Sequence, residues 1–299
     1  MKKMLALLLA LALVIGLVAC GAKEAAEETV EGAAQAAEEV TEEAAEETAE
    51  EVTEEAPEEA AEEAVESDLA YVQEKGTLVV GVTDFAPMDY KDDNDEWIGF
   101  DADMAKAFAA SLGVECEIVE IDWDSKVMEL NAGYIDAVWN GMTITDEVRG
   151  AMEPSTAYCN NAQVIVVNAN VAEQYADVAS CMDLQFAVEA GSAGEAAAME
   201  NGFSFTSVES QATALMEVAS GSSDACVIDL MMAGAMIGEG TSYPDLVSAA
   251  ELTVEEYGVG FRTGSNLVAE LNAFLKECAE NGKLEEIATK YNVQAALIK

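Results

Sequence analysis

The histidine and cysteine side chains that commonly carry catalysis or bind metals are absent or isolated in this chain of 299 residues. It contains no histidine, which excludes Ser-His-Asp catalysis, Cys-His catalysis and zinc sites built on histidine. Its six cysteines form no CxxC pair. Five of them, Cys116, Cys159, Cys181, Cys226 and Cys278, are widely spaced and are expected to be buried as small apolar residues. A single disulfide is the alternative if the chain is exported.

The sixth cysteine, Cys20, ends an N-terminal segment that has the form of a secretory signal. Two lysines are followed by an apolar run over residues 4–18, which is too short to span a bilayer comfortably, and then by Ala19 and Cys20. The tetrapeptide LVAC resembles the bacterial lipobox, in which cleavage leaves a cysteine that carries diacylglycerol. We therefore expect a lipoprotein signal peptide over residues 1–19 and a membrane anchor on Cys20. An ordinary signal peptide that contains a cysteine is the alternative.

Residues 20–67 are predicted to form a charged spacer behind the lipidated cysteine. From about residue 23 the composition is mainly Glu, Ala, Thr and Val, and residues 38–65 form nearly a four-residue repeat. A four-residue period gives no steady apolar stripe on a helix, and like charges at i,i+4 repel. A coiled-coil stalk is the alternative. The net charge of −46 also argues against nucleic acid as a partner, because phosphate binding requires basic patches.

The remaining residues, 68–299, alternate strand-like apolar runs with helix-like segments. Strands are expected at 78–82, 116–121, 135–139, 163–167, 186–188 and 225–228. Helices are expected at 104–112, 126–131, 194–199, 267–278 and 284–290. This alternation predicts an α/β fold with largely parallel sheets covered by helices. Such folds bind ligands at the carboxyl ends of their strands.

Several phrases of residues 68–299 occur in an order that indicates a family. They are GTLVVGV, FAPMDY, WIGFDADMAKAFAASLG, IDWDSKVMELNAGYIDAVWNGMTIT, FAVEAGSAGEAA, SSDACVID, EEYGVGFRTGSN and LKECAENGKLEEIATKYN. Together they resemble the family 3 bacterial extracellular solute-binding proteins, the amino-acid receptors of ABC importers. The resemblance implies a two-lobed periplasmic-binding-protein type II fold. Lobe 1 would comprise 68–159 and 259–299 and lobe 2 would comprise 160–258, with two hinge crossovers near 158–163 and 256–259.

The resemblance also assigns the charged ends of an amino-acid ligand. It places the ligand's ammonium on Asp229, whose alternative role is to cap the following helix. It places the carboxylate at two helix N-termini, where Gly141, Thr143 and Ser192 would donate hydrogen bonds. An arginine normally joins them, but Arg149 comes one residue late, which rotates a helical side chain by about 100°. Arg149 would otherwise form a surface ion pair.

For the ligand's side chain, the resemblance implies a wall made of Phe85, Trp123 and Trp139, with Asp84 and Glu189 nearby. Either tryptophan could instead belong to the core. Two carboxylates favour a polar or cationic amino acid over an acidic one, while aromatic rings can pack alkyl stems or stack on a guanidinium.

The resulting hypothesis is a monomeric, lipid-anchored extracytoplasmic receptor that hands an amino acid to an ABC permease in the membrane. No cofactor or metal is expected, and the chain is not expected to be an enzyme. The alternatives are an accessory receptor for amino-acid sensing and a cyclohexadienyl-dehydratase-like enzyme on the same fold. In the latter, Glu189 would be the candidate acid.

Overall fold

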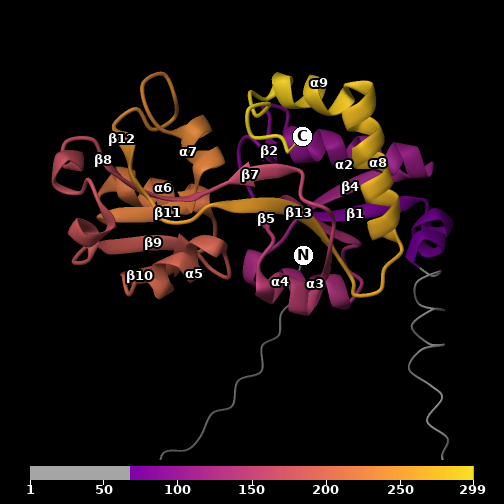
Figure 1. Cartoon of the computed structure of the whole chain (residues 1–299), viewed down its shortest axis with the longest axis horizontal. Coiled ribbons are helices and arrows are strands. Elements are labelled where there is room, and N and C mark those ends of the chain that lie inside the picture. The colour runs from indigo at the N-terminus through magenta and orange to yellow at the C-terminus, as the bar shows by residue number, and fades with distance from the viewer. Residues whose placement is uncertain (1–67, 299) are drawn as a thin grey trace, which may run out of the picture. The chain divides into compact units, whose positions relative to one another are not determined.

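Two β-sheets form the frame of residues 68–298, the part of the chain described by this computed structural model (Figure 1). The expected signal peptide, the lipid anchor on Cys20 and the spacer lie outside the described residues. The first sheet has the strand order β4-β1-β5-β13-β6, with β7 paired to β13. The second has the order β10-β9-β11-β8-β12. We call the parts built on the first and second sheets lobe 1 and lobe 2.

The strands have the following bounds. The first sheet contains β1 (Thr77–Val82), β4 (Glu115–Glu120), β5 (Ala137–Thr143), β6 (Glu153–Pro154), β7 (Cys159–Asn161) and β13 (Glu255–Phe261). The second contains β8 (Gln163–Asn168), β9 (Gln185–Glu189), β10 (Ser204–Val208), β11 (Ala225–Asp229) and β12 (Leu246–Glu251). A separate two-stranded ladder joins β2 (Tyr90–Lys91) to β3 (Trp97–Ile98).

The helices flank these sheets in both lobes. Lobe 1 has a helix over residues 68–75, α2 (Phe100–Leu112), η1 (Trp123–Ser125), α3 (Lys126–Asn131), α4 (Asp146–Ala151), α8 (Leu267–Asn281) and α9 (Lys283–Lys290). Lobe 2 has η2 (Ala172–Gln174), η3 (Val178–Cys181), α5 (Ala193–Glu200), α6 (Gln211–Ser220) and α7 (Leu230–Met236). None of the helices within residues 68–298 is long and apolar enough to cross a membrane.

Each sheet is mixed, with a parallel part that follows the prediction. In lobe 1, β1 pairs in parallel with β4 and β5, and in lobe 2, β9 pairs in parallel with β10 and β11. The strands β13 and β8 are antiparallel to β5 and β11. They begin beside the carboxyl ends of those parallel strands because the chain enters each of them from the opposite lobe. The carboxyl ends of both parallel parts therefore face the junction between the lobes.

The connections place helices on opposite faces of each sheet. From β1 the chain passes through α2 to β4 and then returns through α3 to β5, on the other side of β1. Right-handed crossovers in opposite directions must cover opposite faces. The same logic separates α5 from α6 in lobe 2 (Figure 1). Covering on both faces explains why β11 is buried at every position.

The chain passes between the lobes twice. The first passage lies between β7 and β8, at Ala162, and the second lies between β12 and β13, over residues 252–254. Asn161 in β7 pairs with Glu255 in β13, so the two passages run side by side. The lobe limits at 159/160 and 258/259 stay a prediction.

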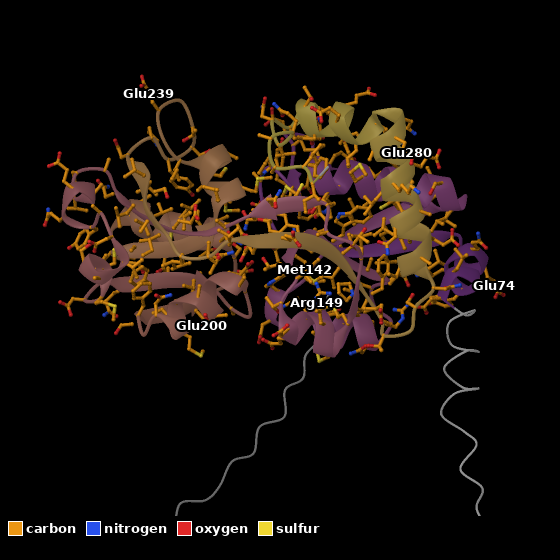
Figure 2. The ribbon with its side chains drawn as sticks, viewed as in Figure 1. Glu74, Met142, Arg149, Glu200, Glu239 and Glu280 are labelled. Carbon is orange, nitrogen blue, oxygen red and sulfur yellow. The ribbon has the colours of Figure 1, made fainter. Side chains whose placement is uncertain are left out.

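The cysteines and the surface charge can be placed in this frame. The five cysteines of the described residues are free thiols, and all except the half-buried Cys116 are buried. This agrees with their interpretation as small apolar residues. Acidic side chains such as Glu74, Glu200, Glu239 and Glu280 project outward at the periphery of both lobes (Figure 2).

Arg262 links the start of the described residues to lobe 1. Its guanidinium lies 3.1 Å from Asp68 Oδ1 and 3.5 Å from Asp136 Oδ1, and it donates to two backbone carbonyls of lobe 1. Lys75 Nζ lies 2.6 Å from the other oxygen of Asp136. Because Asp136 is buried, these cations compensate a carboxylate that would otherwise be costly to bury.

Candidate functional site

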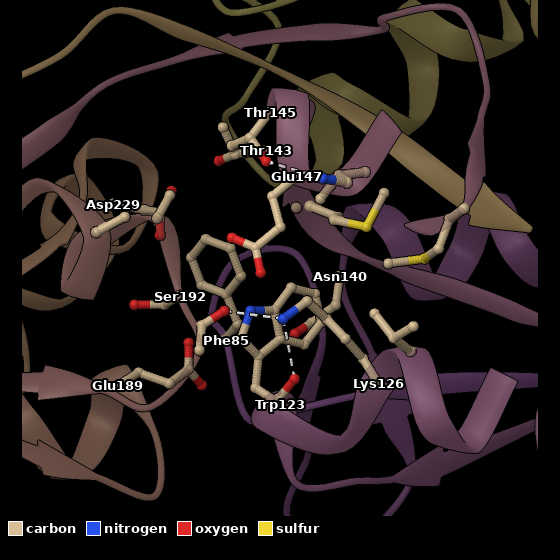
Figure 3. A pocket seen from close by; sticks show the side chains of 18 of the residues that line it. Phe85, Trp123, Lys126, Asn140, Thr143, Thr145, Glu147, Glu189, Ser192 and Asp229 are labelled. Carbon is tan, nitrogen blue, oxygen red and sulfur yellow. Dashed lines mark hydrogen bonds between the residues drawn. The ribbon is translucent and has the colours of Figure 1, made fainter. Parts of the chain in front are cut away.

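A cavity lies where the carboxyl ends of β5, β9 and β11 meet (Figure 3). The space inside it that is open to water-sized molecules is ≈ 80 Å³. Residues of both lobes line it: Phe85, Trp123, Lys126, Val127, Asn140, Gly141, Met142, Thr143, Thr145, Glu147, Val148, Ala151 and Met152 of lobe 1, and Glu189, Gly191, Ser192, Ala193, Ala196, Gln211 and Asp229 of lobe 2. The sequence-predicted residues Phe85, Trp123, Gly141, Thr143, Glu189, Ser192 and Asp229 are therefore brought together.

Asp229 is held at the end of β11 by a dense set of donors. Its Oδ1 accepts hydrogen bonds from Asn161 Nδ2, from Gln163 Nε2 at 3.0 Å and from Tyr257 Oη at 2.7 Å, while Gln211 Nε2 donates to Oδ2. Although Asp229 directly precedes α7, its side chain makes no capping hydrogen bond. Burial raises the pKa of this carboxyl well above its usual range. A ligand cation would favour its ionised form.

Glu255 lies beside Asp229 and shares two of its donors. Its Oε1 accepts hydrogen bonds from Asn161 Nδ2 at 2.6 Å, Gln163 Nε2 at 2.8 Å and Thr143 Oγ1 at 2.8 Å. After burial, the negative charge of Glu255 is the next cause that raises the pKa of Asp229. The hydroxyl of Thr143 thus donates to the protein itself. Thr143 also ends a strand and does not begin a helix, in contrast to the prediction.

The helix N-terminus next to this strand belongs to Thr145. Its backbone is extended, with φ −97° and ψ 169°, and its hydroxyl accepts a hydrogen bond from Val148 N, as an N-cap does. Thr145 and Val148 both line the cavity.

The second predicted helix N-terminus is present at α5. Ser192 caps it, with its hydroxyl accepting a hydrogen bond from Glu195 N at 3.0 Å. Gly191 adopts φ +67°. A Cβ atom at this position would lie 2.9 Å from the Cα of Asp124 in lobe 1. The turn before α5 therefore packs closely against the opposite lobe, and only glycine fits both the conformation and the space.

Lys126 reaches across the junction and was missed by the sequence reasoning. Its side chain is only 9 % exposed, and Nζ donates to Gly191 O at 2.8 Å and to Trp123 O at 3.1 Å (Figure 3). The ammonium also lies 4.8 Å from the centre of the Trp123 ring. Burial lowers the pKa of Lys126, and the negative charge of Glu189 opposes that shift. No motif marks this lysine, which begins α3 directly after η1.

Two further carboxylates face the cavity. Glu189 ends β9 and is 3 % exposed, and its Oε1 has no hydrogen-bond partner within residues 68–298. Burial raises the pKa of Glu189 to about 7. Glu147, from the first turn of α4, points into the cavity from the side of lobe 1 (Figure 3). With Asp229, they make the lining strongly attractive to cations.

Phe85 supplies an aromatic wall whose position depends on Gly141. The ring packs edge-on against Tyr257, with centroids 6.4 Å apart. Gly141 adopts φ +54°, and a Cβ there would lie 2.4 Å from Phe85 Cε1. The amide of Gly141 donates to Asp101 Oδ2 at 2.7 Å. The predicted role of this amide in binding a ligand carboxylate is therefore taken by an internal carboxylate.

Three predicted site residues lie elsewhere. Trp139 is 1 % exposed and packs against Phe108 in lobe 1, which is the core role left open for it. Asp84 is exposed in a separate acidic groove between the lobes. Arg149 is exposed on α4, at the lower side of lobe 1 in Figure 2, whereas its neighbour Val148 lines the cavity. The one-residue offset of the arginine thus turns it out of the site.

The fold and the cavity together define a class: two α/β lobes with a buried polar site at their junction, as in solute receptors that close around a ligand. Residues 78–294 match the family described as bacterial extracellular solute-binding proteins, family 3, and the chain belongs to this family.

Individual relatives agree with this placement. The chain is 29 % identical over 227 residues to the arginine-binding extracellular protein ArtP of Bacillus subtilis, covering 73 % of this chain and 86 % of that protein. A mutant of the arginine-binding protein ArgBP of T. maritima has a TM-score of 0.71 at 30 % identity, covering 75 % of this chain and 98 % of that one.

A third similarity bears on the enzyme alternative. The ancestral amino-acid-binding protein AncCDT-1, a precursor of cyclohexadienyl dehydratase, has a TM-score of 0.69 at 32 % identity, over 75 % of this chain and 98 % of that one. That protein is itself described as a binding protein. The named relatives are solute-binding proteins, and this chain is therefore a binding protein and not an enzyme.

Proposed function

We propose that this chain is a lipid-anchored receptor that binds a cationic amino acid between its lobes and delivers it to an ABC importer. The observation that carries the proposal is the charge of the cavity, into which Asp229, Glu189 and Glu147 face. A ligand with an α-ammonium and a second cationic group would satisfy the carboxylates of Asp229 and Glu189, which are otherwise costly to bury. The arginine named for ArtP and for the arginine-bound ArgBP of T. maritima supports the same ligand class.

The ligand can be oriented from the groups on each wall. Asp229 would bind the α-ammonium, because its carboxylate is held in place at the end of β11. Phe85 and Trp123 would pack along the alkyl stem, and Glu189, with its unpaired oxygen, would bind the cationic end. The α-carboxylate would meet the N-terminus of α5, whose cap is Ser192.

A ligand panel tests this assignment. Purified protein is melted with and without each of the common amino acids and their close relatives. Cationic amino acids should stabilise the folded protein by about 3–4 kcal/mol at 100 to 1,000 times Kd. Acidic amino acids should give no shift, because they bring further negative charge to a site rich in carboxylates. Absence of a shift with every amino acid in the panel would overturn the proposal.

The anchor is tested separately. The Cys20→Ser chain should lose lipid labelling and leave the membrane fraction of cells, while its ligand-dependent thermal shift stays that of the wild type. Retention of the lipid label on the Cys20→Ser variant would contradict the anchor and leave the ligand assignment untouched. Loss of growth on the ligand as a nutrient, in cells that lack the protein, would support delivery to an importer.

A further inference from the structure

Lys126 is a buried cation with no ion-pair partner within residues 68–298. Two of its three N–H groups donate to the carbonyls of Gly191 and Trp123, which leaves one N–H for another acceptor. Burying an ammonium without a counter-ion is costly, since carbonyl dipoles replace only part of its hydration. The cavity therefore contains a place in which an anion would be stabilised.

That place adjoins the N-terminus of α5. The acceptor Gly191 O, 2.8 Å from Nζ, directly precedes the cap residue Ser192. The hydroxyl of Ser192 accepts from Glu195 N, so its own proton is available to a further acceptor. The first amides of a helix have no carbonyl partner within the helix. Lys126 from lobe 1 and the start of α5 from lobe 2 thus place donors in the same cavity as the carboxylates (Figure 3).

The arginine expected at the ligand carboxylate does not supply this charge. Arg149 is exposed, and the helical position that faces the cavity is occupied by Val148. Arg262, the other arginine of the chain, pairs with Asp68 and Asp136 and does not line the cavity. Among the residues that line the cavity, Lys126 is the single cationic side chain.

We propose that Lys126, in place of Arg149, pairs with the α-carboxylate of the ligand and links that carboxylate to both lobes. This inference rests on the proposed function, because it presumes an amino-acid ligand. Lys126 already bonds across the junction to Gly191, so a carboxylate held between Nζ and α5 strengthens a contact that closes the lobes. Lys126 is then a specificity residue that rejects ligands without a carboxylate.

The test compares arginine with agmatine, which keeps the amine and the guanidinium but lacks the carboxylate. Binding of both is measured by calorimetry on the wild-type chain, Lys126→Met, Lys126→Arg and Arg149→Met. The wild type should bind arginine about 10- to 100-fold more tightly than agmatine, the range expected for a charged hydrogen-bonded pair. Lys126→Met should bring that ratio close to one by weakening arginine alone. Lys126→Arg should keep a preference, and Arg149→Met should keep the wild-type ratio.

The outcomes separate the inference from the function on which it rests. A wild-type ratio near one, an unchanged ratio in Lys126→Met, or a collapse of the ratio in Arg149→Met would each overturn the role of Lys126 while leaving amino-acid binding intact. If no amino acid binds the wild type, the proposed function itself fails. Circular dichroism shows whether Lys126→Met is folded. If it is not, the arginine and agmatine affinities are compared in Lys126→Gln and Lys126→Arg instead. Loss of the arginine preference in both charge-preserving and neutral variants would indicate a packing role and refute the pairing.

Discussion

The pH dependence of ligand binding offers a sharp test of Glu189. Burial of this carboxyl raises its pKa from 4.5 to about 7, and a ligand cation can pair only with the ionised form. Binding of a cationic side chain must therefore release a proton below pH 7, so affinity should rise as the pH increases. Stability of the free protein should change in the opposite sense. The folded state holds the proton more tightly, so this contribution is fully present below pH 4.5 and is lost as the pH rises through 7.

The size of the effect follows from the pKa. With a pKa of about 7, roughly 1 % of Glu189 is ionised at pH 5 and about 90 % at pH 8. The dissociation constant for a cationic amino acid should thus fall about 100-fold over that interval, which equals about 2.7 kcal/mol. Asp229, whose pKa is also raised, adds its own dependence in wild type and variant alike.

Calorimetry at pH 5, 6, 7 and 8 isolates the contribution of Glu189. Arginine is titrated into the wild type and into Glu189→Gln, which keeps the shape of the side chain and removes the titration. Citrulline, a neutral analogue of arginine, serves as the ligand control. In the wild type, the dissociation constant for arginine should fall about 100-fold more between pH 5 and pH 8 than it does in Glu189→Gln. The pH dependence of the dissociation constant for citrulline should be nearly the same in the two proteins. Equal pH profiles for arginine in wild type and variant would refute the pairing of Glu189 with the ligand.

Three further changes have defined outcomes. Asp229→Asn should abolish the ligand-induced thermal shift, and retained binding would show that the ammonium lies elsewhere. Gly141→Ala should lower the free energy of unfolding in urea by about 1–3 kcal/mol, because its Cβ would meet an aromatic ring at 2.4 Å; Gly150→Ala, with open space around it, is the matched control. Arg262→Met should cost about 3 kcal/mol in the same assay by weakening the compensation of buried Asp136, and an unchanged midpoint would contradict that role.

Local patterns in the sequence were enough to predict many elements. The apolar run over 78–82 corresponds to β1, and the segment 126–131 coincides with α3. The helix expected at 104–112 ends at Leu112 as predicted, with Gly113 as its C-cap at φ +77°, but it begins earlier, at Phe100. The helices α6 and α7 were not anticipated. Their apolar faces pack on strands of lobe 2, and the sequence does not show which strands will be adjacent.

The order of apolar runs in the sequence by itself determined the α/β class, because alternation of strand-like and helix-like segments is a local property of the chain. The two lobes, with Asp229 and Glu189 at strand ends and Ser192 at a helix N-terminus, followed from the family resemblance. Only the tertiary structure decided which groups are free to meet a ligand. Gly141 and Thr143 are occupied by Asp101 and Glu255, which are 40 and 112 residues away in sequence.

Tertiary contacts also decide which basic residue lines the cavity. Arg149 and Lys126 are both basic residues of short helices, and their surroundings in sequence do not show which of them faces the cavity. Burial in the folded chain distinguishes the two residues. The helical rotation at α4 directs Arg149 to solvent, whereas α3 brings Lys126 Nζ to within 2.8 Å of Gly191 O in the other lobe. Hydrogen bonds across the junction depend on how the two lobes meet. The packing of the whole chain sets that arrangement, and no local sequence pattern predicts it.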